Sequence, residues 1–89
     1  MKIKSGFVLR QLADTWVVLP LLSQSLNFNG MLTLNETGAF LWRRLEEGSD
    51  PSTLVAALCD EYEVTGEQAA LDVDTFLATL REAGCIDMQ

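Results

Sequence analysis

Residues 30–36, Gly-Met-Leu-Thr-Leu-Asn-Glu, contain the point at which the hydrophobic pattern of this chain changes. The segments before Asn35 include short runs rich in β-branched and aromatic residues, which are typical of strands. Beyond Asn35 the apolar residues recur with the period of a helix. Asn35 is a favourable N-cap, and Glu36 places a carboxylate in the first turn, where the helix dipole favours it. We therefore expect the strands to precede this point and the helices to follow it.

Three strands are expected before the change. They cover residues about 3–12, 15–20 and 30–34. Ala13-Asp14 provides a tight turn between the first two strands, and Pro20 ends the second. Asn29-Gly30 is a turn signal in front of the third strand. Three short strands in succession most simply form an antiparallel meander.

Three helices are expected after the change. They cover residues about 36–47, 51–62 and 66–83. Asp50 as N-cap with Pro51 at the first helical position is a strong start signal for the second helix. Thr65 and Gln68 fit a capping box at the start of the third helix. Residues 1–89 are thus predicted to form a single α+β domain, a winged helix-turn-helix in which a three-stranded antiparallel sheet is followed by three helices.

The composition argues against an enzyme and against a metal site. The chain has 89 residues, enough for one domain, and no histidine, the commonest general base. Cys59 and Cys85 are too few and too far apart in sequence for a zinc site or a disulfide framework. No glycine-rich loop that could hold a phosphate is present. We expect a non-catalytic domain with no metal and no cofactor.

The charge distribution argues against nucleic acid. Residues 1–34 carry a net charge of +2, whereas residues 35–89 carry −9. The expected third helix occupies the position of a DNA-recognition helix, yet residues 66–83 have a net charge of −3. Such a helix is repelled by phosphates. A winged-helix regulator that binds DNA or dimerises is therefore kept only as the alternative function.

The sequence also argues against a membrane span and a secretory signal. The longest uncharged stretch, between Thr15 and Glu36, is interrupted by Pro20, Gly30 and several polar residues. It is too polar and too broken to cross a bilayer. We expect a cytoplasmic protein.

The expected third strand is an unguarded sheet edge. Residues 30–34 contain no charge and no proline, whereas Lys2, Lys4 and Arg10 fall on the expected first strand and discourage pairing there. An edge of this kind can accept an extended peptide as an additional strand. A short strand covered by a helix, or an edge that pairs with itself in a homodimer, would explain the same pattern. Alternation places Leu32 and Leu34 on one face, but it leaves open whether that face is the core.

The segment Leu34-Asn35-Glu36-Thr37-Gly38-Ala39-Phe40-Leu41-Trp42 resembles the PqqD-like family, the peptide recognition elements of ribosomally made, post-translationally modified peptides. The likeness extends through residues 54–58 and Tyr62 into Asp72-Val73-Asp74-Thr75-Phe76-Leu77, and ends in Ala83-Gly84-Cys85-Ile86. Residues 6–10 and 28–31 also resemble the family, so the likeness covers nearly the whole chain.

The resemblance implies a function and a site. Family members bind the leader segment of a precursor peptide as an added antiparallel strand between the third strand and the third helix. They serve a modifying enzyme, often a radical SAM (iron–sulfur) enzyme. Carried over by position, the peptide-binding residues would be Gly30, Met31, Leu32, Thr33, Leu34, Val73, Phe76, Leu77, Leu80 and Arg81. Arg81 would meet a leader carboxylate at the rim, whereas Val73, Leu77 and Leu80 could equally fill the core.

Overall fold

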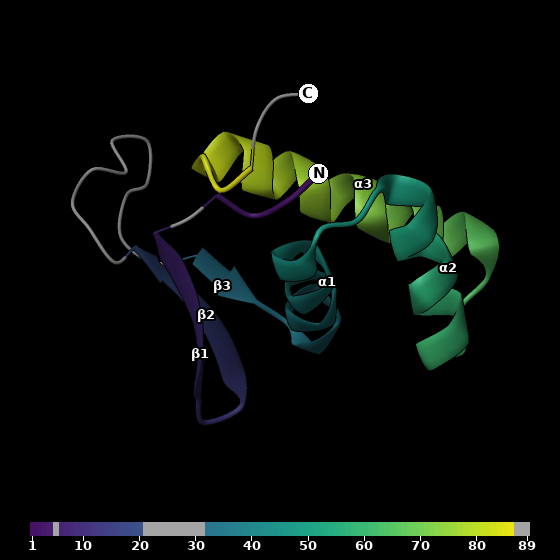
Figure 1. Ribbon diagram of the computed structural model, residues 1–89. Helices are drawn as coiled ribbons and strands as arrows, with labels where there is room; N and C mark the ends of the chain where they lie inside the picture. The colour runs from purple at the N-terminus through teal and green to yellow at the C-terminus, as the bar shows by residue number, and fades with distance from the viewer. Residues whose placement is uncertain (5, 21–31, 87–89) are drawn as a thin grey trace.

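In the computed structural model, which describes residues 1–4, 6–20 and 32–86, the strands precede Asn35 and the helices follow it (Figure 1). The elements are β1 (Phe7–Leu12), β2 (Thr15–Pro20), β3 (Leu32–Leu34), α1 (Glu36–Glu47), α2 (Pro51–Glu61) and α3 (Gly66–Ala83). The expected α+β fold, with three strands followed by three helices, is confirmed. Residues 30 and 31 of the expected third strand lie outside the described residues.

The sheet is the expected antiparallel meander, with strand order β1-β2-β3. Arg10 lies opposite Val17, and Val17 lies opposite Thr33 on its other side. The turn between β1 and β2 is tight, and Ala13 adopts a φ of 55°, the left-handed backbone that such turns require. Within the described part of the chain β3 is therefore an edge strand.

The first strand begins later than its sequence suggests. The prediction was residue 3, but β1 starts at Phe7, and Ile3 instead forms an isolated bridge with Ile86. Gly6 has a φ of 100°, which is incompatible with a continuous strand and separates the two segments. Lys2 and Lys4, two of the cations predicted to guard the first strand, therefore lie outside it.

Each helix begins at the predicted cap. The side chains of Asn35, Asp50 and Thr65 accept hydrogen bonds from backbone N–H groups three residues later, at 2.7, 2.8 and 3.1 Å. The bond from the Thr53 backbone N–H lowers the pKa of Asp50. The side-chain amide of Gln68 donates to Asp72, one turn later in the helix, at 2.9 Å, whereas in a capping box this side chain would accept from the backbone N–H of Thr65.

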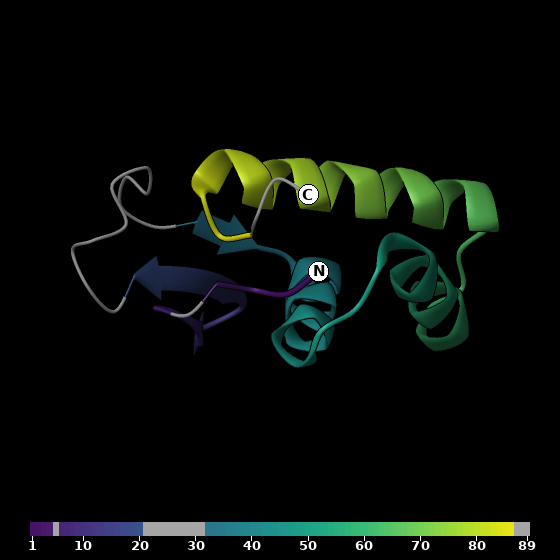
Figure 2. The same cartoon turned by 45° about the horizontal axis from the view of Figure 1, so that its top comes forward.

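The core lies between the sheet and the helices. Trp42, the largest of its buried side chains, is surrounded by leucines of all three helices. The α3 helix runs along β3 and above α1, and the second view shows the same arrangement (Figure 2). Leu32 and Leu34 face the core while Thr33 is exposed, which settles the orientation that the sequence left open.

Candidate functional site

An open groove with a volume of about 490 Å³ lies between the β3–α1 junction and α3. We call it the β3–α3 groove. It is lined by Thr33, Leu34, Asn35, Thr37, Gly38, Leu41, Asp72, Thr75, Phe76 and Thr79. The groove is thus formed by the end of β3, the first half of α1 and the middle of α3.

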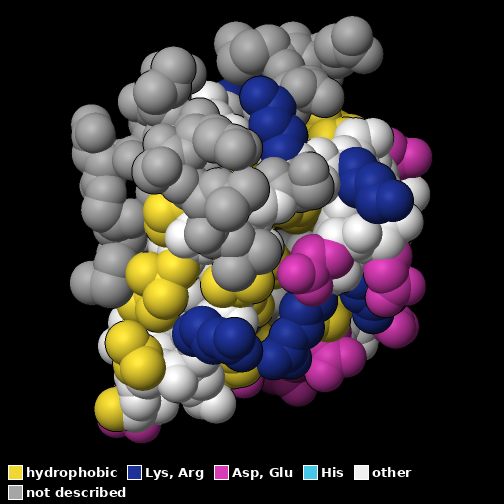
Figure 3. Space-filling view, turned by 60° about the vertical axis from the view of Figure 1, so that its left-hand side comes forward, with side chains coloured by type: hydrophobic (Ala, Val, Ile, Leu, Met, Phe, Trp, Pro, Cys, Tyr) yellow, Lys and Arg dark blue, Asp and Glu magenta, His cyan; other side chains and the backbone are white. Residues whose placement is uncertain are grey.

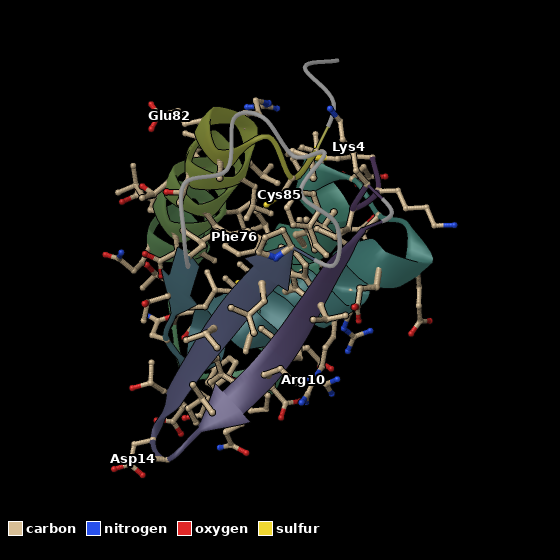
Figure 4. All side chains as sticks on the ribbon, turned by 90° about the vertical axis from the view of Figure 1, so that its left-hand side faces the viewer. Lys4, Arg10, Asp14, Phe76, Glu82 and Cys85 are labelled. Carbon is tan, nitrogen blue, oxygen red and sulfur yellow. The ribbon has the colours of Figure 1, made fainter. Side chains whose placement is uncertain are left out.

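The apolar part of the groove is an extension of the hydrophobic core. Leu34, Leu41 and Phe76 belong to the core cluster and also line the groove. Phe76 is 7% exposed and lies between α3 and the sheet (Figure 4). An apolar side chain placed on this surface would add to a well-packed core, which is the arrangement that favours binding of an apolar anchor.

The α3 wall of the groove is one face of the helix. Asp72, Thr75, Phe76 and Thr79 follow the i, i+3, i+4, i+7 spacing that brings side chains onto one face. The hydroxyl of Thr79 donates to the backbone carbonyl of Thr75 at 3.0 Å. Asp72 accepts a hydrogen bond from Gln68 one turn earlier. This wall is therefore mostly polar around a single aromatic side chain.

The opposite wall depends on a glycine. A Cβ atom added to Gly38 would lie 3.2 Å from both Asn35 Oδ1 and Leu34 Cβ. Such contacts are tighter than ordinary packing, so a side chain at residue 38 would force the cap and the end of β3 apart. Glycine at this position lets the start of α1 approach β3 closely and shapes the groove there.

The free side of β3 completes the site. Successive residues of a strand direct their N–H and C=O groups to opposite sides, so only alternate residues pair with β2. The remaining backbone groups of β3 point away from β2, and no described strand lies on that side. An extended chain placed there can form strand-pairing hydrogen bonds.

The structure brings only some of the ten predicted residues together in the groove. Thr33, Leu34 and Phe76 line it. Val73, Leu77 and Leu80 lie in the core, where they are 0%, 2% and 0% exposed. Leu32 packs against the core. Arg81 is half-buried in the last turn of α3, outside the lining set, and residues 30 and 31 are outside the described residues.

Sequence reasoning missed the polar members of the groove. Asp72, Thr75 and Thr79 resemble an ordinary solvated helix face, but Asp72 and Thr79 lie four residues before and three residues after Phe76, and Thr75 has helical spacing from both of them. Asn35, which was predicted as an N-cap, has that role and also lines the groove, as does Gly38, which packs closely against Leu34.

The described residues contain neither a candidate metal site nor a candidate membrane-spanning helix. Across residues 1–4, 6–20 and 32–86 no group of three or more His, Cys, Asp or Glu side chains could hold a metal ion. In the same part of the chain, each helix is too short or too polar to cross a membrane. Cys59 is exposed and Cys85 is buried, and neither forms a disulfide.

Comparison with known proteins places the chain in a family. The family model described as coenzyme PQQ synthesis protein D (PqqD) matches residues 15–86. A solved structure of TbiB1 in complex with the TbiA(beta) leader peptide is 29% identical, with a TM-score of 0.79, and the match covers 100% of this chain and 98% of that one. A lasso peptide synthetase B1 complexed with the leader peptide is 26% identical, with a TM-score of 0.73 and coverage of 94% and 93%. A comparison with curated proteins finds no match. The family match spans most of the chain, and the chain belongs to the PqqD family.

Proposed function

We propose that this chain is a non-catalytic adaptor that binds the leader segment of a ribosomally synthesised precursor peptide and presents it to a modifying enzyme. The leader would lie in the β3–α3 groove as an added strand on the free side of β3. The observation that carries the proposal is a groove with an apolar floor of Leu34, Leu41 and Phe76 directly beside an open strand edge. The two similar structures, each a complex with a leader peptide, support it.

Strand addition on this groove gives moderate affinity. Each strand-pairing hydrogen bond contributes about 1 kcal/mol, and each buried apolar anchor about 2 kcal/mol. Ordering a flexible peptide offsets roughly 2–5 kcal/mol of that gain. We expect a dissociation constant of about 1 μM or weaker, equivalent to about −8 kcal/mol. Such affinity suits an adaptor that must release its peptide.

The proposed contact set follows the groove. Thr33, Leu34 and Phe76 remain in it, and the polar residues of the α3 wall join them. Val73, Leu77 and Leu80 are assigned a supporting role, because their burial fixes the position of α3. Arg81 stays a prediction for the rim.

The chemistry of modification is assigned to the partner. We propose a radical SAM or other modifying enzyme as that partner, acting in the cytoplasm. The DNA-binding alternative is not favoured, since α3 carries a net charge of −3 and Asp72 lies on its groove face. On the face shown in Figure 3, Lys and Arg side chains are interspersed with acidic and hydrophobic ones, unlike a continuous basic surface.

A nuclear magnetic resonance titration tests the proposal. The probe is the leader segment of the precursor peptide encoded beside this protein. We expect the amide signals of Leu32–Leu34 and of Asp72, Phe76 and Thr79 to shift or broaden. The amide of Ala56, on the exposed side of α2, is the internal control and should not move. Unchanged signals in β3 and α3 would rule out this binding mode.

A further inference from the structure

Among the described residues, Asp72 is the one ionisable residue that lines the β3–α3 groove. The other nine lining residues are apolar, or are glycine, asparagine and threonines. Asp72 is half-buried and lies one helical turn before Phe76, which is the aromatic part of the groove. A carboxylate therefore sits next to the surface on which an apolar side chain of the peptide would rest.

A hydrogen bond orients the Asp72 carboxylate, and no cation among the described groove-lining residues offsets its negative charge. The side-chain amide of Gln68 donates to its Oδ1 at 2.9 Å, which fixes the carboxylate on the groove face. Among the described residues that line the groove there is no Lys or Arg to offset this carboxylate. The Gln68 amide satisfies one acceptor while leaving a full negative charge at the groove.

A bound peptide would remove water from this carboxylate. Burying a charge without a partner is costly, whereas a cation placed against it forms a charge-assisted hydrogen bond. A peptide carboxylate at the same place would be repelled by Asp72 and by the net charge of −7 on the whole chain. The groove thus distinguishes peptides by the charge of the residue that faces Asp72.

We infer that Asp72 is a specificity-determining residue, which selects leader segments carrying Lys or Arg beside the apolar side chain that rests on Phe76. The inference rests on the proposed function, because it assumes that a peptide occupies the groove. It adds the chemical class of the peptide: an extended segment with an apolar residue and a neighbouring basic residue at fixed spacing.

Asp74 provides a matched control on the same helix. It follows Asp72 by two residues, which rotates its side chain by about 200° around the helix axis. It is exposed and does not line the groove. Replacing either residue by asparagine removes one negative charge from α3, so only the position of the charge differs between the two variants. The side-chain amide oxygen introduced by Asp72→Asn can still accept from Gln68, and melting curves should show that both variants remain folded.

The test uses a displayed library of random 12-residue peptides, selected separately on the wild type, Asp72→Asn, Asp74→Asn and Asp72→Lys. We expect Lys or Arg to be enriched at one fixed distance from an apolar residue with the wild type and with Asp74→Asn. The enrichment should disappear with Asp72→Asn and be replaced by Asp or Glu with Asp72→Lys. In a selected synthetic peptide, replacing that Lys by Met should weaken binding to the wild type about tenfold and to Asp72→Asn less than about twofold.

The remaining outcomes separate this inference from the proposed function. Apolar peptides that bind in the groove with no basic preference, or with the same preference in Asp72→Asn, overturn the inference and leave the adaptor function intact. A basic preference lost equally in Asp74→Asn overturns it too, because the net charge would then be the cause. If no peptide is enriched on any folded variant, both the inference and the proposed function fail.

Discussion

The two faces of α3 differ in what surrounds them. Val73, Leu77 and Leu80 are enclosed by the core, whereas Asp72, Thr75 and Thr79 line the groove. Phe76 belongs to both faces. The apolar stripe of this helix holds the fold together, whereas the selective binding proposed above is assigned to its neighbouring polar stripe. Variants of the two faces can separate these contributions.

Truncating the core face should cost the most stability. Leu77→Ala leaves a cavity under α3, and we expect it to lower the free energy of unfolding by about 3 kcal/mol. Chemical denaturation measures the change. Leu71→Ala is the control, since Leu71 lies on the same helix but is 61% exposed, and it should change stability by less than about 0.5 kcal/mol. Equal losses in the two variants would contradict the division of α3 into faces.

High pH should lower the free energy of unfolding through Cys85, a buried residue just beyond the end of α3. Burial raises the pKa of its thiol from 9.0 to about 11. Between these values the unfolded chain loses the thiol proton while the folded protein keeps it, so this group makes stability fall as the pH rises from 9 to 11. We expect a loss of about 2 kcal/mol in denaturation curves across that range.

Two cysteine variants isolate this effect. Cys59→Ser changes an exposed thiol and should leave the pH dependence as it is in the wild type. Cys85→Ala removes the titrating group, so its stability should fall less steeply over the same pH range. An unchanged slope in Cys85→Ala would assign the effect to other groups.

Replacing Phe76, which belongs to both faces of α3, should lower both the stability of the fold and the affinity for peptide. Phe76→Leu keeps an apolar side chain in the core but removes the ring from the groove, so we expect a stability loss of about 1 kcal/mol. Peptide affinity should fall about tenfold, as for a lost apolar anchor. Calorimetric titration with a peptide selected on the wild type measures the affinity. An affinity loss no larger for Phe76→Leu than for folded Leu77→Ala would remove Phe76 from the binding surface.

The polar stripe should affect binding with little effect on stability. Thr75→Val removes one hydroxyl from the groove wall at nearly constant volume. The free energy of unfolding should change by less than about 0.5 kcal/mol, and peptide affinity should fall about threefold. Thr15→Val, at an exposed position of the β1–β2 hairpin, should leave affinity unchanged. A large stability change in Thr75→Val would mean that this stripe also supports the fold.

Much of the fold could be predicted from local signals. Asn35, Asp50 and Thr65 are caps whose chemistry does not depend on distant parts of the chain, and all three start helices as expected. The start of β1 could not be predicted, because Ile3 has a favourable partner in Ile86 at the other end of the sequence and Gly6 permits the break. Local propensity contains no information about such a pairing.

The site was predicted less completely than the fold. The resemblance to a family indicated that the third helix faces the third strand, and Phe76, one of the residues it named, lines the groove. The same resemblance also named Val73 and Leu77, for which a role in the core was kept open, and both are enclosed by the core with almost no surface left for a ligand. The polar residues that border the groove have the same composition as a solvated surface. Their position is apparent only once α3 has been packed against β3.

The contacts of residues 1–4 have a consequence for the order of folding during synthesis. The backbone N–H of Ile3 donates to the carbonyl of Leu45 at 3.2 Å, and that of Lys4 donates to the carbonyl of Cys85 at 2.8 Å. Part of the contact made by residues 3 and 4 therefore depends on a partner that is synthesised more than eighty positions after them. The hairpin and the start of α1 depend on nearer contacts and can form earlier, while the closing of the N-terminal segment onto Cys85 and Ile86 is necessarily a late step. Purified chains truncated before residue 85 should therefore leave residues 1–4 more open to proteolysis than the 89-residue chain does.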